Sequence, residues 1–133
     1  MKKIRALGIL GFIICTGFKK PITLVTDYRD TYVGTYNCKC YTKQLSSVTT
    51  QLTYRFDTTT TSISVAKDAL DSVLQITVNG QVLKAKLVSK HLYAYPTPIP
   101  QYGGGFYATD SIGFYNIPNL HASSRFLGKK TGP

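Results

Sequence analysis

Carboxylates, histidines and long apolar runs are scarce in this 133-residue chain, and each shortage narrows its chemistry. Its only acids are six Asp, most of which stand beside turn signals, so a pair of opposed carboxylates of the glycosidase type is not expected. The only histidines are His91 and His121, and no nucleophile motif surrounds any Ser or Cys. A catalytic triad is therefore not expected, and we predict a protein that is not an enzyme and needs no cofactor.

The charge balance is strongly basic. Sixteen Lys and Arg against six Asp give a formal net charge of +10. A basic surface favours anionic partners such as phosphate head groups, lipopolysaccharide or nucleic acid. The cations are scattered along the chain, however, so solubility alone is the simpler explanation of this charge.

The first 17 residues have the pattern of a signal peptide. Three cations at residues 2–5 precede an uncharged run, ALGILGFIIC, over residues 6–15. This run is shorter than the roughly 20 apolar residues of a membrane-spanning helix, but it suits a secretion apparatus. We therefore expect an exported protein of the cell envelope, periplasmic or outer-membrane, with a signal peptide over residues 1–17. A tether over residues 18–30 and a single domain over residues 31–130 would follow.

Two processing routes compete at the end of the signal peptide. Cys15 would carry the lipid if the chain is a lipoprotein cleaved before this residue, although Ile13 and Ile14 replace the usual small residue of a lipobox. Simple cleavage after Gly17 is the alternative, because Cys15 and Gly17 are small residues at the right spacing.

From residue 32 onward the sequence predicts strands. Tyr, Thr and Val are abundant, and the period is two residues rather than that of a helix. The clearest signal is Asn79-Gly80 between two alternating runs, which predicts a hairpin with a type I′ turn. The expected strands cover residues 32–43, 48–57, 62–67, 72–78, 81–89, 92–95, 106–109, 111–117 and 124–129. Eight to nine short strands of this spacing indicate an all-β antiparallel meander, as a barrel or a sandwich.

Breakers and the chain end separate or finish these strands. Three prolines and three glycines over residues 96–105 predict a break in the sheet, with the glycines forming a flexible loop. Asp68 and Asp71 favour a turn over a helix in residues 65–74. We expect the last residues, 130–133, to be frayed.

The layout resembles small lipoproteins of Bacteroidetes-type bacteria. The resemblance rests on the signal peptide ending near Cys15, the segment DYRD-T-YVGTY over residues 27–36, Asp110-Ser111-Ile112, and a terminal FLGKK over residues 126–130. It covers nearly the whole chain. It implies a lipocalin-like barrel, attachment to the envelope membrane through a lipid anchor, and binding of a small apolar ligand. It implies no catalytic residues.

Cys38 and Cys40 are the most unusual local pattern. On a strand, residues i and i+2 point to the same face with Cα atoms roughly 6.5 Å apart, near the upper limit for a disulfide. We interpret the pair as two small core residues, ahead of a disulfide and ahead of a soft-metal site completed by His91 or His121.

Aromatic residues around the Pro/Gly segment are the best candidates for a binding site. Tyrosine combines apolar area with a hydrogen-bonding tip, which suits ligand pockets, although Tyr is also common in ordinary sheets. The predicted ligand-binding residues are Tyr93, Tyr95, Tyr102, Phe106, Tyr107 and Tyr115. The expected function is binding of a small apolar or amphipathic ligand. The alternative is an interaction module without a cavity that contacts envelope proteins or anionic lipid; nucleic acid is not expected because of the export signal.

Overall fold

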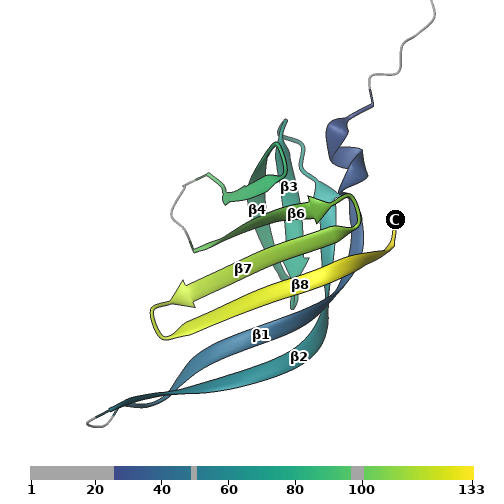
Figure 1. Ribbon diagram of the computed structural model, residues 1–133. Coiled ribbons are helices and arrows are strands. Elements are labelled where there is room, and N and C mark those ends of the chain that lie inside the picture. The colour runs from purple at the N-terminus through teal and green to yellow at the C-terminus, as the bar shows by residue number, and fades with distance from the viewer. Residues whose placement is uncertain (1–25, 49–50, 97–100) are drawn as a thin grey trace, which may run out of the picture.

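The chain forms a closed barrel of eight antiparallel strands, each paired with the next in sequence, and β8 pairs with β1 (Figure 1). The computed structural model describes residues 26–48, 51–96 and 101–133. The predicted signal peptide and Cys15 lie outside these residues. A short 3-10 helix, η1, spans Tyr28–Thr31. The strands are β1 Gly34–Val48, β2 Leu52–Lys67, β3 Val73–Val78, β4 Gln81–Val88, β5 His91–Ala94, β6 Tyr102–Ala108, β7 Ser111–Asn119 and β8 Ala122–Gly132.

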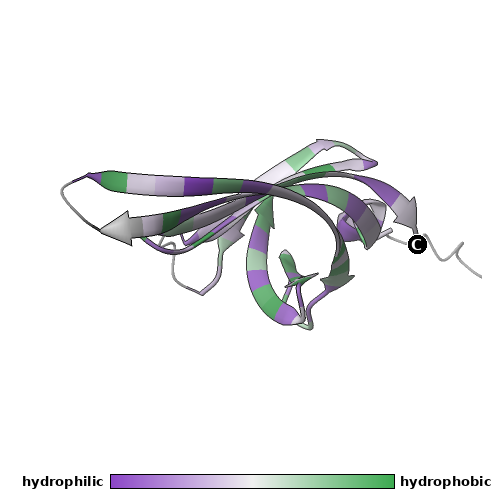
Figure 2. Cartoon of the chain, turned by 90° about the horizontal axis from the view of Figure 1, so that it is seen from below, coloured by the Kyte–Doolittle hydropathy of each residue, from purple (hydrophilic) through white to green (hydrophobic). Residues whose placement is uncertain are grey.

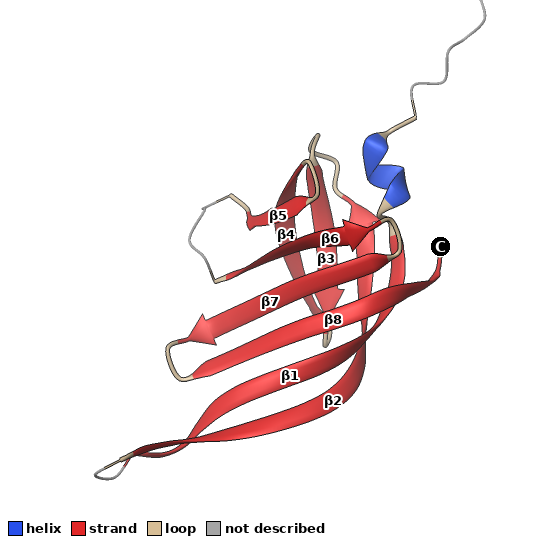
Figure 3. Cartoon of the chain, viewed as in Figure 1, coloured by secondary structure: helices blue, strands red, loops and turns tan. Residues whose placement is uncertain are grey.

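This architecture confirms the predicted all-β antiparallel meander (Figure 3). Alternate residues of each strand face the barrel interior, and these positions carry the apolar side chains. Seventeen buried residues from η1's flank and all eight strands form one packed cluster. Within it, the rings of Tyr32 and Phe106 stack with centroids 4.3 Å apart, and the Tyr36 hydroxyl donates a 2.7 Å hydrogen bond to the Tyr32 carbonyl. Burial raises the pKa of Tyr36 to about 12.

The predicted hairpin is confirmed. Asn79 and Gly80 have φ angles of 49° and 77°, as a type I′ turn requires, and Val78 pairs with Gln81 across it. Along β4, Leu83, Ala85 and Leu87 are buried, and the intervening lysines are exposed. Successive residues of this strand therefore point alternately to solvent and to the core, as its sequence indicates.

The two strands predicted over residues 48–57 and 62–67 are one continuous strand, β2. The four threonines between them, residues 58–61, were expected to separate two strands, but β-branched side chains favour extended backbone and these residues pair with β1 throughout. Strand β3 pairs only with residues 63–67 of β2. The remainder of β2 pairs only with β1 among the described strands, and β1 is itself paired with β8 as far as Gln44. Beyond that point the end of β1 and the start of β2 project as a two-stranded tip (Figure 1). We call residues 41–48 and 52–60 the arm.

The glycine-rich segment was wrongly predicted as a flexible loop. Gly103, Gly104 and Gly105 lie in β6, and they pair with both β5 and β7. Gly104 has φ 151°, and a Cβ there would overlap the carbonyl oxygen of Gly113 on the neighbouring strand. These glycines allow a close approach of strands rather than a break in the sheet.

The prediction of a frayed C-terminus was also wrong. Strand β8 continues to Gly132, which pairs with Thr35 at the start of β1. The Lys130 amide donates a 2.7 Å hydrogen bond to the Asp110 carbonyl. The last residues belong to the barrel because they complete its closure.

Residues 27–31 close one end of the barrel. The buried Arg29 side chain donates from Nη1 to the carbonyls of Asp68, Leu70 and Val73 at 3.2, 2.8 and 3.1 Å. Its Nη2 donates to Asp27 at 2.7 Å, and the hydrogen-bonded Arg29 guanidinium lowers the pKa of the Asp27 carboxyl to about 2. The described part of the segment predicted as a tether is therefore attached to the β2–β3 turn through the side chain of Arg29. No helix in the described residues is long and apolar enough to cross a bilayer.

Candidate binding groove

The six aromatic residues predicted to bind a ligand do not gather at one site. Phe106 is in the core, and Tyr102 is half-buried against it. The Tyr102 hydroxyl donates to the carbonyls of Lys84 and Tyr95, at 2.8 and 3.2 Å, which ties β4 to the end of β5. Tyr93 and Tyr107 are exposed on the outside of the barrel. Tyr107 and Tyr115 share a hollow on the outer face, and Phe106 and Tyr107 share another of about 350 Å³ beside Lys90 and His91.

A shallow groove crosses the outer face of the sheet from β6 to β2. It consists of three adjoining hollows of about 270, 570 and 370 Å³. The first two share Tyr107 and Arg125, and the last two share Leu127, Gly128 and Lys129. We call this feature the outer groove. Its remaining lining residues include Gly104, Gly113, Tyr115, Ser111, Asn37, Lys39 and Thr60.

An arginine flanked by two tyrosines lies along this face. Arg125 of β8 is directly opposite Tyr115 of β7 on one side and Tyr41 of β1 on the other. Both tyrosines are partly exposed, at 37% and 42% of their surface. Neighbouring strands are about 4.8 Å apart, so the two tyrosine backbones are about 10 Å apart with the guanidinium-bearing strand between them. This row offers two amphipathic rings and one fixed positive charge to the same ligand.

Glycine shapes the floor of the outer groove. The ring of Tyr107 covers Gly113, where a Cβ would overlap it. In the same way, Tyr115 reaches over Gly103, where a Cβ would stand 2.9 Å from its hydroxyl oxygen. Because the two glycines have no side chain, the rings of Tyr107 and Tyr115 can pack flat against the sheet. The glycines thereby restrict the position of the Tyr107 ring, although this side chain remains 68% exposed.

The charge of the outer groove is positive. Lys129 is 3.9 Å from Asp110, whereas Lys39 and Arg125 form no ion pair within the part of the chain that the structure describes. The polar side chains of Asn37, Thr60 and Ser111 stand beside these cations. The groove therefore combines unneutralised cations with groups that can donate and accept hydrogen bonds.

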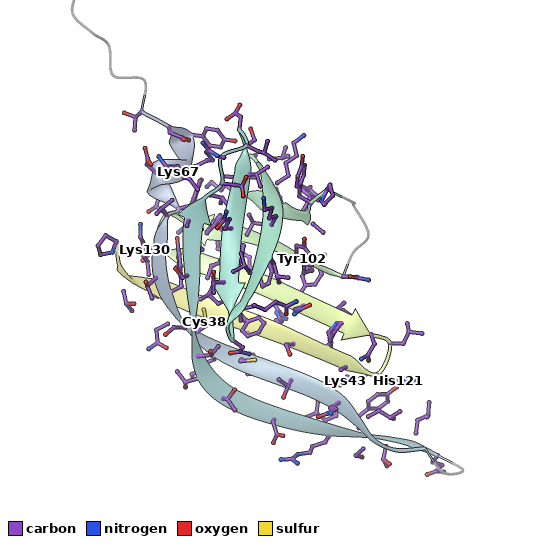
Figure 4. The ribbon with its side chains drawn as sticks, turned by 180° about the vertical axis from the view of Figure 1, so that it is seen from behind. Cys38, Lys43, Lys67, Tyr102, His121 and Lys130 are labelled. Atoms are coloured by element: carbon purple, nitrogen blue, oxygen red, sulfur yellow. The ribbon has the colours of Figure 1, made fainter. Side chains whose placement is uncertain are left out.

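A second, separate hollow of about 240 Å³ lies at the base of the arm, between β1, β2 and the β7–β8 turn. The Lys43 ammonium is 4.0 Å from the centroid of the Tyr54 ring, a cation–π contact. His121 of the turn lines the same hollow, and Figure 4 shows Lys43 and His121 together at this end of the molecule.

Cys38 and Cys40 are buried side chains of the core and form no disulfide, which agrees with the preferred interpretation. Burial raises the pKa of the Cys38 thiol to about 11, with a smaller contribution from neighbouring Cys40. Both histidines named as completing ligands are exposed and lie on β5 and the β7–β8 turn. The described residues contain no group of three or more His, Cys, Asp or Glu that could hold a metal ion.

Comparisons with family models, curated proteins and solved structures returned no match to this chain. The resemblance to envelope lipoproteins therefore remains a prediction. Sequence reasoning identified Tyr107 and Tyr115 but missed Tyr41, Lys39 and Arg125. Their alternation with core residues places each on an outer face, but only the register of β7, β8 and β1 brings them together.

Proposed function

We propose that this protein is a non-enzymatic binding module that holds an acidic polysaccharide in its outer groove. The observation that carries the proposal is the row Tyr115–Arg125–Tyr41. Tyr115 and Arg125 line a groove that crosses several strands, and Tyr41 is the neighbour of Arg125 on β1. A long shallow groove suits a chain-like ligand better than a compact one. Tyrosine rings can pack on the apolar faces of sugar rings, while Arg125 and Lys39 can pair with acidic substituents.

The barrel interior is a less favourable site for the small apolar ligand expected from the resemblance. The inward positions form one cluster of packed side chains, including Ile63, Leu74, Ile76 and Phe126 at 0–1% exposure. A small eight-stranded barrel can be filled by its own side chains in this way. A ligand inside would have to displace part of this core.

Charge density favours a polysaccharide over nucleic acid. A nucleic acid strand carries a negative charge on every phosphate, and binding is driven by many cations along its path. The outer groove has three cations, one of which is near Asp110. Its hydroxyl and amide groups match sugar hydroxyls, and a chain with sparse carboxylates or sulfates matches the wide spacing of its cations. Export to the cell envelope, which the sequence predicts, would bring the protein to such polymers.

The test is binding of a carboxymethyl dextran of low substitution, measured by biolayer interferometry, with neutral dextran of equal length as the control. We expect binding that weakens as salt rises and that falls roughly tenfold or more in Arg125→Ala, because a hydrogen bond to a charged group contributes about 1.5–3 kcal/mol. Gly113→Ala should also weaken binding, since it displaces the Tyr107 ring. Lys86→Ala, on the exposed face of β4, is the matched charge control.

The proposal is wrong if Arg125→Ala and Lys86→Ala bind equally well. Preference for a single-stranded oligonucleotide over carboxymethyl dextran at equal charge would instead assign the groove to nucleic acid. Binding to neutral dextran at the same strength would remove the role assigned to the cations.

A further inference from the structure

Among the residues that the structure describes, no strand pairs with the outer edge of the arm. Residues 52–60 of β2 pair with β1 on one side, and β3 begins its pairing only at Ile63. At Thr61 the side chain already reaches the β3–β4 turn, donating to Asn79 at 3.0 Å. In the nine residues before it, every second residue directs its N–H and C=O groups toward the unpaired edge. Such an edge is a template for another strand.

This edge lacks most of the features that protect sheet edges. The stretch reads LTYRFDTTT, with no proline and no lysine. The described β-bulge of the β1–β2 pair is in β1, between Leu45 and Ser47, and leaves β2 regular. Thr, Tyr and Phe all favour strands. On the outer side of the stretch, Leu52 and Phe56 are 58% and 71% exposed, and Figure 2 shows apolar and polar residues alternating along the projecting strands.

The charges of the stretch are arranged symmetrically about Phe56. Arg55 and Asp57 share the face opposite to Phe56, are both exposed, and are paired with each other at 2.8 Å. If two copies of β2 pair antiparallel with Phe56 opposite Phe56, then Arg55 of one copy stands directly opposite Asp57 of the other. Opposite charges in directly opposed positions stabilise an antiparallel pair, whereas like charges would destabilise it.

We propose that two copies of this chain associate through their β2 edges, antiparallel and centred on Phe56. The pairing covers residues 52–60 of both copies, which is the stretch that β3 leaves open. It joins the two arms into one antiparallel ribbon, which β8 of each copy flanks as far as Gln44 of β1. The β3 strands of the two copies lie at opposite ends of the paired stretch, so they do not collide. Phe56 of one copy packs beside Phe56 of the other on the exposed outer side. The proposal is independent of the outer groove.

The symmetry also sets the relation between the two outer faces. A twofold axis perpendicular to the ribbon keeps the outer side of both copies on the same side. Two outer grooves would then face one polymer, and binding by both would be tighter than binding by one.

Sedimentation equilibrium of the full chain over a range of concentrations tests the association. We expect a reversible monomer–dimer equilibrium that either Asp57→Arg or Arg55→Asp weakens by tenfold or more. The double variant Arg55→Asp/Asp57→Arg should restore it, because the opposed pairs are complementary again. Lys86→Glu, with the same change in net charge as Arg55→Asp, should not alter it. A protein that stays monomeric at all concentrations, or reversals without effect, would overturn the proposal.

Disulfide trapping tests the register separately and does not depend on the charge variants. Directly opposed residues of an antiparallel pair have Cα atoms about 4.5–5.5 Å apart, within the range of a disulfide. Cys15 is replaced by Ser in this test and in every other thiol measurement, because its thiol would otherwise react independently of the fold. In this Cys15→Ser background, Phe56→Cys should give a covalent dimer under mild oxidation. Thr58→Cys, on the same side of the strand but opposite Tyr54 of the other copy, should not. Equal trapping at both positions would refute the register centred on Phe56.

Discussion

Substituting Gly128 tests how tightly the closing strands are packed. Gly128 of β8 pairs with Cys38 of β1, and a Cβ at this position would overlap the Cys38 sulfur and the Asn37 carbonyl oxygen. One of these obstacles is backbone, so the strands must shift. Extra volume in a packed core typically costs about 1–3 kcal/mol. Replacing a strand glycine by alanine also stabilises the fold by roughly 0.5–1 kcal/mol, because alanine loses less backbone entropy on folding. The two effects oppose each other, so we expect Gly128→Ala to lower the free energy of unfolding by about 1–2 kcal/mol.

Urea unfolding of Gly128→Ala, Gly132→Ala and wild type measures this difference. Gly132 is in the same strand, and a Cβ there would meet no atom within 4 Å, so its substitution should be neutral or slightly stabilising. The m-value should not change, because the barrel itself is retained.

A double-mutant cycle then identifies the sulfur as the obstacle. Cys38→Ala alone should cost about 1 kcal/mol for the lost buried group. Combined with Gly128→Ala, it should cost less than the sum of the two single changes, by an amount of about 1 kcal/mol, since the alanine methyl takes the place of the sulfur. Strict additivity, or a Gly128→Ala variant as stable as wild type, would refute the packing described for β1 and β8.

The remaining predictions concern acid stability and thiol reactivity. Asp27 and Asp68 both have pKa values lowered in the folded chain, Asp27 to about 2 by Arg29 and Asp68 by hydrogen bonds from Gln75 and Leu70, then Lys84. Because the folded values lie below the unfolded value near 3.9, this stabilisation is present above about pH 4 and is lost as the pH falls through 2; thermal unfolding between pH 6 and 2 should show the decline, and Asp27→Asn should reduce it. In a Cys15→Ser background, Cys38 and Cys40 should react with Ellman's reagent far more slowly in the native protein than in denaturant, since burial disfavours the thiolate; fast reaction of this native variant would contradict the described core.

The sequence was sufficient to predict elements that depend on neighbouring residues. The alternation of Leu83, Ala85 and Leu87 with lysines predicts the core face of β4, and Asn79-Gly80 predicts the turn that precedes it. Both are local signals, because the pleat and the sign of φ act within a few residues. The interpretation of Cys38 and Cys40 as core residues rests on the same pleat, and both are buried.

The errors fall where a distant strand decides the local structure. Glycine is rare in strands, so the sequence predicted a loop over residues 103–105. These residues form a strand because Gly113 and Tyr115 approach them too closely for a side chain. The sequence predicted a frayed end from residue 130 onward. In the structure the Lys130 amide donates to the Asp110 carbonyl and its ammonium group donates to the Thr31 carbonyl. The outer groove has the same origin, since Lys39 and Leu127, which both line it, are adjacent only after β8 closes on β1.

Barrel closure also has a consequence for the time course of folding. The Thr131 hydroxyl donates to the Thr35 carbonyl across 96 positions of sequence, and the whole β1–β8 seam joins similarly distant residues. Loop closure of this length costs entropy before its contacts form, so folding through such non-local pairing is slow. Until β8 arrives, β1 has a free edge as well as residues 52–60 of β2, and a nascent chain therefore exposes a further template for strand exchange that β8 covers in the finished barrel.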